Sequence, residues 1–319
     1  MINKKTIFIL GAGASKPYGF PTGQELREKI IKEGASRLAG LNKNSWNSEE
    51  YFNTGKQFTS IFDKSGVTSI DKFLNMQTEE YVTYGKILIM AFIRDFEKHS
   101  KFNENIEHPE QDWYRIFWNK LISGVEKFED ISFDNFQVIT FNYDRSFEFY
   151  LYLTVRNLFP KKNISDDQVI ALMKTLNVKH VFGRVEDMIW ENGNSFDETN
   201  VLRYYNNLHY DYRTLYDKVS EINIINEVKK DTSEFKEIIE NSDEVFFLGF
   251  GFLEENMKLL GAPFSRKKDI RYFASGYKLS KEIRQRIFIR YFNNAMLLRY
   301  YDVSIFDCDC AELLRNHLD

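Results

Sequence analysis

The segment Thr6-Ile7-Phe8-Ile9-Leu10-Gly11-Ala12-Gly13-Ala14-Ser15 joins an apolar run to a run of small residues. Its first half is an apolar run, which is typical of a strand that is buried on both faces of a sheet. Its second half consists of small residues and predicts a tight turn. Thr22 and Glu25 then have the spacing of a capping box, so we expect a helix to begin near Thr22. The order of strand, glycine turn and helix indicates an α/β protein.

The same alternation of apolar strands and helices continues along the chain. Because buried strands separated by helices pack as a parallel sheet, we expect an α/β fold with a doubly wound, mostly parallel, Rossmann-like sheet. We treat residues 1–319 as one domain with helical insertions at about 45–130 and 184–228. Further strands are expected at 135–141, 178–182, 244–248, 269–273 and within 295–306, and helices at 81–96, 113–128, 145–158, 254–260, 278–291 and 310–318.

Composition excludes several classes of protein. The 43 Lys and Arg against 47 Asp and Glu give a net charge of −4, so nucleic acid is not expected as the main partner, although a weak contact through the basic helix near residues 284–290 stays open. The two cysteines, Cys308 and Cys310, are too few for a disulfide scaffold or a four-cysteine zinc site, and we expect no metal. The longest apolar run, 87–93, is far shorter than the ~18 residues of a membrane span, and the apolar run at the N-terminus is too short for a signal peptide. We therefore expect a cytoplasmic protein without membrane contact.

Small and polar residues follow four of the expected strands, and ligands of doubly wound sheets bind beyond these strand ends. In segment 11–15, small side chains would let a phosphate approach the backbone. The segment lacks the third glycine of the dinucleotide fingerprint and the Gly-Lys-Ser/Thr of a P-loop, which disfavours an ordinary dehydrogenase or ATPase. A tight turn without a ligand is the alternative interpretation. The other three segments are 142–144, 180–183 and 249–251.

Two short polar side chains, Asn142 and Asp144, come directly after a buried strand. An Asn in this place can fix a water or a substrate hydroxyl, because its amide donates and accepts hydrogen bonds. An Asp can accept from an amide or hold a ribose. An Asn turn followed by an Asp helix cap is an equally good interpretation. His180 lies inside the next strand-like segment, where a histidine is more often a core residue than a catalyst.

Taken together, these segments resemble the sirtuin-like family of NAD-consuming domains, in particular its bacterial branch associated with anti-phage defence. The resemblance covers residues 6 to about 260. Each motif is short, but the ordered set is more specific than any one of them. The matching motifs are Gly11-Ala12-Gly13-Ala14-Ser15, Gly19-Phe20-Pro21-Thr22-Gly23, Ser69-Ile70-Asp71-Lys72-Phe73-Leu74, Thr140-Phe141-Asn142-Tyr143-Asp144 with Glu148, and Leu248-Gly249-Phe250-Gly251-Phe252.

The resemblance implies a protein that binds NAD as its substrate and cleaves it to nicotinamide and ADP-ribose, in abortive infection. Asn142 would position the attacking water, Asp144 would hold the nicotinamide amide, and His180 would be the general base. The NAD-binding residues implied are Gly11, Ala12, Gly13, Ser15, Thr22, Thr140, Phe141, Gly249, Phe250 and Gly251.

The chain departs from the sirtuin-like pattern in two ways. It lacks the four cysteines of the deacetylase zinc module, so hydrolysis is favoured over deacylation. The family usually has a histidine directly before the glycine that follows this strand. Here Phe182 precedes Gly183, and His180 stands two residues earlier. Because residues i and i+2 share one face of a strand, His180 could still reach the site from one position further back.

An NAD hydrolase must be restrained until it is triggered. We therefore expect a homo-oligomer, or control by a defence-cassette partner such as an ATPase or an Argonaute-like protein. The alternative is a module that binds NAD or ADP-ribose without cleaving it, which the Phe182 departure favours. A subunit that handles nucleic acid through the basic helix is a weaker third hypothesis.

Overall fold

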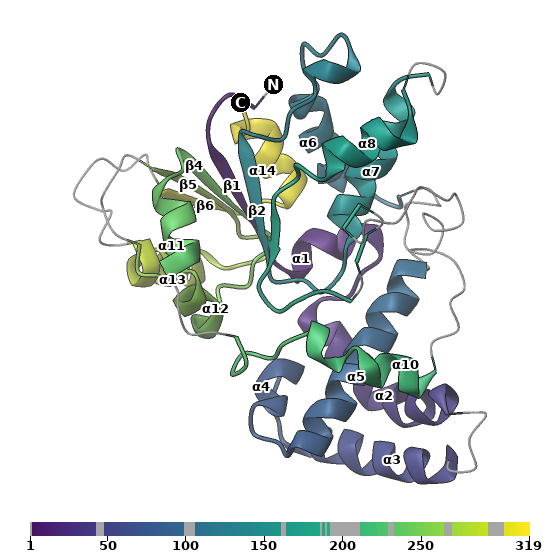
Figure 1. The fold of residues 1–319 in the computed structure, drawn as a ribbon. Coiled ribbons are helices and arrows are strands. Elements are labelled where there is room, and N and C mark those ends of the chain that lie inside the picture. Colours follow the sequence, from purple (N-terminus) through teal and green to yellow (C-terminus); the bar gives the residue numbers. More distant parts are fainter. Residues whose placement is uncertain are drawn as a thin grey trace.

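The computed structural model describes residues 2–42, 48–98, 106–160, 164–185, 187–188, 190–191, 211–228, 233–264, 270–292 and 303–319. Within these residues, six strands form one sheet at the centre of the molecule (Figure 1). The expected doubly wound α/β fold is therefore confirmed. The strands are β1 (Thr6–Leu10), β2 (Phe136–Thr140), β3 (Val178–His180), β4 (Glu244–Leu248), β5 (Arg271–Ser275) and β6 (Val303–Phe306).

The strand order in the sheet is β3-β2-β1-β4-β5-β6, and every pairing between neighbours is parallel. This is the strand order of dinucleotide-binding folds, in which the direction of winding reverses between β1 and β4. Leu10, the last residue of β1, lies opposite Thr140 of β2 and Leu248 of β4. The three strands therefore end at the same level, and the segments that follow them meet at one edge of the sheet.

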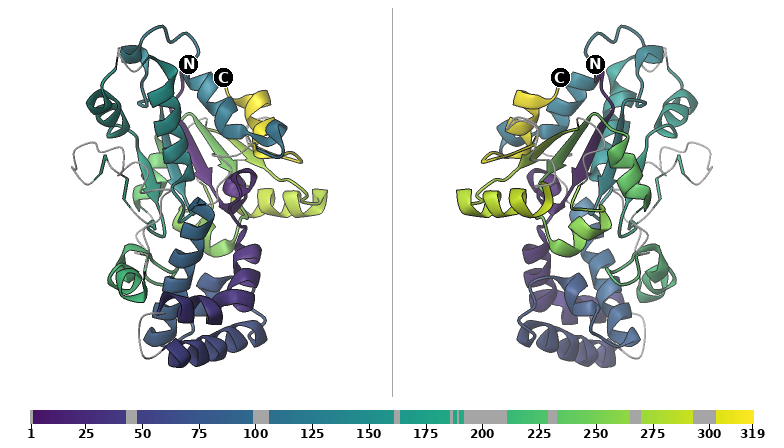
Figure 2. Two further views of the ribbon diagram at one scale, coloured as in Figure 1. Left: turned by 90° about the vertical axis from the view of Figure 1, so that its right-hand side faces the viewer. Right: turned by 90° about the vertical axis from the view of Figure 1, so that its left-hand side faces the viewer.

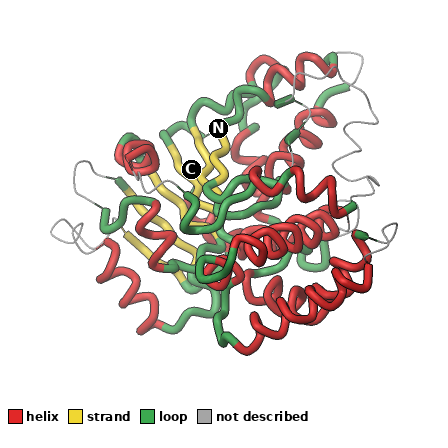
Figure 3. Tube along the Cα trace, turned by 60° about the horizontal axis from the view of Figure 1, so that its bottom comes forward, coloured by secondary structure: helices red, strands yellow, loops and turns green. Residues whose placement is uncertain are grey.

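Helices cover both faces of this sheet (Figures 1 and 3). Several short 3₁₀ turns, among them η1 (Lys16–Tyr18), η3 (Pro109–Gln111), η4 (Phe128–Asp130) and η5 (Val219–Glu221), join the elements. The helices are α1 (Ala12–Ser15), α2 (Gly23–Leu41), α3 (Ser48–Lys64), α4 (Ile70–Leu74), α5 (Glu79–Lys98), α6 (Trp113–Leu121), α7 (Ser146–Leu158), α8 (Asp166–Met173), α10 (Tyr212–Asp217), α11 (Ser233–Glu240), α12 (Glu254–Leu259), α13 (Lys281–Phe292) and α14 (Cys310–His317).

Strand β1 shows why both faces need a cover. Ile7 and Ile9 belong to one apolar cluster, together with residues of α11, α12 and the helices of the insertion. Phe8 and Leu10 belong to the opposite cluster, with residues of α6, α7, α8 and α14. Side chains alternate between the two faces of a strand, so an apolar run that faces two layers must be apolar at every position.

The insertion expected at 45–130 is helical where the structure describes it. Helices α3, α4 and α5 pack with α2 and α10 in a layer beyond the carboxyl edge of the sheet, which we call the helical layer (Figures 1 and 2). Helix α6 differs, because it lies against the sheet itself. Of the insertion expected at 184–228, the middle part, 192–210, lies outside the described residues.

Several expected elements differ in extent from the observed ones, and three of the differences show where an element stops or starts. Helix α6 ends at Leu121 rather than at 128, since Gly124 takes a left-handed conformation with φ of 79°. Strand β3 ends at His180, whose carbonyl accepts the N–H of Gly183 in a turn. The expected helix at 278–291 begins only at Lys281. Residues 293–302, in which the last strand was expected to begin, lie outside the described residues.

The packing of Phe8 gives a direct test of the fold. Its ring lies 5.2 Å from that of Phe117 and 5.5 Å from that of Phe246, and the side chain is 1% exposed. We expect Phe8→Ala to lower the free energy of unfolding by about 3–5 kcal/mol, as for other large-to-small core changes. Ile289→Ala, at a side chain that is 55% exposed, should change it by less than about 0.5 kcal/mol. Chemical denaturation of both variants measures the difference, and equal losses would contradict the described core.

Candidate functional site at the carboxyl edge of the sheet

Two turns meet backbone to backbone where β1 and β4 end. The N–H of Gly11 donates to the carbonyl of Leu248, and the N–H of Gly13 donates to that of Gly249, each at 3.0 Å. Gly249 has a φ of 57°, and a Cβ placed on it would lie 2.0 Å from the nitrogen of Ala14. A Cβ on Gly11 would likewise lie 2.6 Å from the Gly249 oxygen. The glycines are therefore required by this contact, whether or not a ligand binds.

The same contact determines which donors the glycine turn can offer to an anion. The N–H groups of Gly11 and Gly13 are engaged with β4, and the N–H of Ala14 donates to the carbonyl of Gly11. Ala12 is the first residue of α1, so its N–H has no acceptor inside that helix. Ala12 and Gly13 are partly exposed. The part of this turn that can approach a phosphate is therefore centred on Ala12. The other residues that the sequence suggested in this turn have their N–H groups engaged or their side chains buried.

Asn142 is bound to the glycine turn by hydrogen bonds of its side chain. Its main-chain N–H donates to Oγ1 of Thr140 at 3.1 Å. Its side-chain Nδ2 donates to the carbonyl of Gly11 and to Oγ of Ser15, both at 3.1 Å. Because a carbonyl only accepts, this contact fixes which end of the amide is nitrogen. The remaining amide oxygen, Oδ1, is buried and has no hydrogen-bond partner within the described part of the chain.

Asp144 continues the hydrogen-bond chain that begins at Asn142. The hydroxyl of Ser15, which accepts from Asn142, donates to Oδ1 of Asp144 at 3.2 Å. The same oxygen accepts from the main-chain N–H of Ser146 at 3.1 Å and from the Ser146 hydroxyl. Burial raises the pKa of the Asp144 carboxyl above its ordinary value. The bond from the Ser146 N–H lies at the start of α7, but the N-cap residue of that helix is Arg145, so Asp144 is not the helix cap of the alternative interpretation.

Both ring nitrogens of His180 lie against oxygen atoms. Its Nδ1 lies 3.0 Å from the main-chain oxygen of Asn142, and its Nε2 lies 2.8 Å from Oε1 of Glu148. The side chain is 3% exposed. Neither ring nitrogen is free to meet a water in this arrangement. The role of general base, which the sequence suggested for His180, stays a prediction that this geometry does not favour.

A buried ion pair lies behind His180. Oε1 of Glu148 also accepts from Nε of Arg145 at 2.7 Å, and the Arg145 guanidinium reaches Glu191 through two further bonds of 3.0 Å. Burial by itself raises the pKa of Glu148, but the charges of Arg145 and His180 outweigh it and hold the pKa at about 2. Glu148 is therefore ionised at neutral pH, although its side chain is only 4% exposed.

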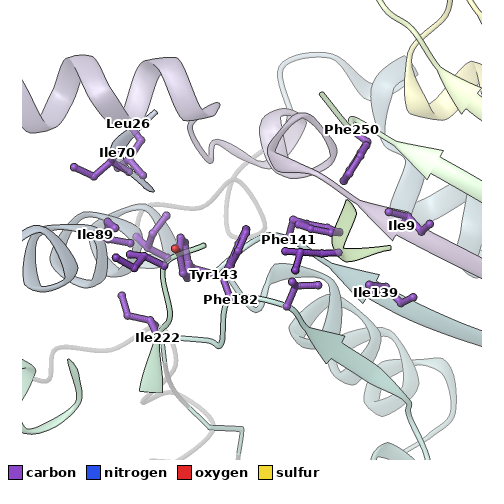
Figure 4. Packing of buried hydrophobic residues seen from close by; sticks show 14 of the residues in the cluster. Ile9, Leu26, Ile70, Ile89, Ile139, Phe141, Tyr143, Phe182, Ile222 and Phe250 are labelled. Carbon is purple, nitrogen blue, oxygen red and sulfur yellow. The ribbon is translucent and has the colours of Figure 1, made fainter. Parts of the chain in front are cut away.

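The remaining expected site residues serve mainly local structure. Thr22 caps α2, because its Oγ1 accepts from the N–H of Glu25 and the Glu25 carboxylate binds back to Thr22, which confirms the capping box. Phe141 packs edge-on against Phe182 and Phe250, at 5.6 and 5.1 Å between ring centres (Figure 4). Gly251, by contrast, is exposed.

A link between the sheet and the helical layer was missed by the sequence analysis. The hydroxyl of Tyr143 lies 2.7 Å from Oδ1 of Asp71 in α4 and 3.1 Å from the carbonyl of Asn223. Figure 4 shows the Tyr143 ring between the two parts of the molecule. Both Tyr143 and Asp71 stand in motifs of the sirtuin-like set, and this was the available signal. Nothing in the sequence indicates that the two side chains pair. The charged contact between Arg145 and Glu191 had no such signal.

No family model matches the chain, and no curated protein matches it. Among the described helices, none is both long and apolar enough to cross a membrane. Within the described ranges there is also no group of three or more His, Cys, Asp and Glu side chains placed to hold a metal ion.

The backbone contact at Gly249 can be tested with a matched pair of substitutions. Gly249→Ala forces a left-handed conformation on a residue with a Cβ, which costs ~1–2 kcal/mol, and adds an overlap with Ala14. Gly251→Ala meets nothing within 4 Å. We expect a clear fall in the thermal midpoint for Gly249→Ala and almost none for Gly251→Ala, measured by circular dichroism. If Gly249→Ala melts like the wild type, the described contact is wrong.

The ion pair at Glu148 predicts a specific acid sensitivity. A carboxyl whose pKa falls from 4.5 in the unfolded chain to about 2 stabilises the folded state above pH 4.5, and this contribution is lost as the pH falls toward 2. Between pH 5 and pH 3 the loss amounts to about 2 kcal/mol. Glu148→Gln should be less stable than the wild type at pH 7 and should lack this part of the pH dependence in urea denaturation. Glu126→Gln, at an exposed position, is the control and should keep the wild-type dependence.

Proposed function

We propose that this protein is an NAD⁺ hydrolase, which cleaves NAD⁺ to nicotinamide and ADP-ribose. The observation that carries the proposal is the state of the Asn142 side chain. Its nitrogen is fixed by Gly11 and Ser15, while its oxygen is buried and has no donor among the described residues. A buried acceptor without a donor is costly in a folded protein, so we infer that a water or a substrate hydroxyl supplies the donor.

The reaction needs little more than correct placement of water. The water oxygen forms a bond to the anomeric carbon of the nicotinamide ribose, while the bond from that carbon to the pyridinium nitrogen breaks. The electron pair of the broken bond stays on nicotinamide, which leaves as a neutral molecule, and one water proton passes to solvent. Oδ1 of Asn142 would accept one hydrogen of the water and so direct an oxygen lone pair at the ribose carbon.

Asp144 and the glycine turn would hold the two other parts of NAD⁺. The described hydrogen bonds to Asp144 all reach Oδ1, so Oδ2 is the oxygen that would accept from the nicotinamide carboxamide. Ala12 and Gly13 would approach the pyrophosphate from the partly exposed side of the turn. Gly251 would line the adenosine side. The location agrees with the rule that ligands of such sheets bind where the direction of winding reverses, here between β1 and β4.

The biological setting belongs to the same proposal. The motifs that resemble the sirtuin-like defence branch favour an effector of abortive infection, which is restrained by assembly or by a partner until infection. The helical layer is the part of the molecule that we propose for such control, because Tyr143 and Asp71 connect it directly to the end of β2.

A second function, an NAD or ADP-ribose sensor, is favoured by one observation. Both nitrogens of His180 are engaged, so the site as described offers no free imidazole base. A sensor would bind NAD⁺ and release it intact. Recovery of unchanged NAD⁺ after prolonged incubation with the bound protein, in the presence of its assembly partners, would favour this second function over hydrolysis.

The direct test is nicotinamide release from NAD⁺ by the purified protein and by Asn142→Ala. Loss of the fixed amide should reduce the rate by about 10²-fold or more, because the water is no longer oriented. Asn119→Ala, which removes an exposed Asn from α6, is the matched control and should keep the wild-type rate. Circular dichroism checks that both variants are folded.

Binding must be measured beside turnover, since the protein is expected to be restrained. Isothermal titration with NAD⁺ should give saturable binding by the wild type. A folded wild-type protein that neither binds NAD⁺ nor releases nicotinamide, alone or in cell extract, would contradict both candidate functions. Equal nicotinamide release by wild type and Asn142→Ala would contradict the role given to Asn142.

A further inference from the structure

His180 has two hydrogen-bond partners, and both of them only accept. Nδ1 faces the main-chain oxygen of Asn142 at 3.0 Å, and Nε2 faces the carboxylate of Glu148 at 2.8 Å. A carbonyl oxygen has no proton to give, and the Glu148 carboxyl accepts from the Arg145 guanidinium at 2.7 Å, which favours its ionised form. Both ring nitrogens must therefore donate. A ring that makes both bonds carries two protons and a positive charge.

His180 stands at one end of a buried chain of polar and charged groups. Glu148 is shared between His180 and Arg145, at 2.8 and 2.7 Å. Arg145 in turn binds Glu191, whose Oε2 accepts the main-chain N–H of Met188 at 2.7 Å. The side chains of His180, Glu148 and Arg145 are each less than 5% exposed. Such a chain is rigid, because leaving any one of its charges unpaired in the interior is strongly unfavourable.

We propose that His180 is a positioning residue, whose imidazolium fixes the main-chain carbonyl of Asn142 and thereby aims the Asn142 amide at the substrate. This inference rests on the proposed function, but in it His180 does not act as a base. Asn142 is then held from two sides. Its side-chain nitrogen is bound by Gly11 and Ser15, and its carbonyl is bound by His180.

Further charged groups pack around the Arg145 end of this chain. Glu148 and Arg145 come from the first turn of α7 and the residue before it, and Asp144 precedes them in the chain. Oε1 of Glu97, near the end of α5, lies 3.3 Å from the main-chain nitrogen of Arg145. The segment after β3 brings Glu191 and Arg184.

The test is whether both ring nitrogens of His180 carry a proton in the intact protein at neutral pH. In protein labelled with ¹⁵N-histidine, we expect a proton on each ring nitrogen of His180, with its signals assigned by their loss in His180→Asn. If that variant does not fold, substitution of the other four histidines assigns the signals by elimination. A His180 ring with one bare nitrogen would overturn the proposal, whatever the enzyme activity.

A second readout separates positioning from proton transfer. His180→Asn can keep a donor near the position of Nδ1 but cannot act as a base, whereas His180→Ala can do neither. We expect the kcat for nicotinamide release to be ~10-fold or more higher in His180→Asn than in His180→Ala, with similar KM values for NAD⁺. Equal kcat values, each about 10²–10⁴-fold below wild type, would indicate proton transfer and contradict the proposal. If the wild type neither binds NAD⁺ nor releases nicotinamide, alone or in cell extract, the proposed function fails, while the nitrogen spectrum still decides this inference.

Discussion

The rest of the site depends on one close contact, in which the turn after β1 and the turn after β4 touch through their backbones. The hydrogen bonds from Gly11 to Leu248 and from Gly13 to Gly249 hold the two turns together, and no Cβ fits between them. Because β1 and β4 flank the point where the winding of the sheet reverses, this contact joins its two halves. It also fixes the carbonyl of Gly11, to which the side chain of Asn142 is bound.

The polar groups of the site form two sets of hydrogen bonds, which meet at Asn142. One set runs from Asn142 through Ser15 to Asp144 and gives the turn its side-chain hydrogen bonds. The other set, which includes His180 and Glu148, holds the same Asn142 through its main chain. These hydrogen bonds together fix the orientation of the Asn142 amide. A residue that positions water needs this kind of preorganisation.

Much of the fold could be predicted from the sequence, since the strands at 6–10 and 244–248 are apolar at every position and match the structure residue for residue. Parallel strands also end at one edge, so the meeting of Asn142 with the glycine turn was expected. The partners of His180 could not be predicted, because Glu148 lies 32 residues away and reaches it only through the packing of α7 on the sheet. For the same reason, the sequence could suggest a base at His180 but could not show that both nitrogens are engaged.

The central claim is that the amide oxygen of Asn142 receives its missing donor from the reacting end of NAD⁺ or from the attacking water. A crystal structure with a slowly hydrolysed NAD⁺ analogue tests this most directly. We expect a water or a ribose hydroxyl within about 3.2 Å of Oδ1 of Asn142, next to the anomeric carbon of the nicotinamide ribose. A nicotinamide ribose bound elsewhere, with Oδ1 still lacking a donor, would contradict the account.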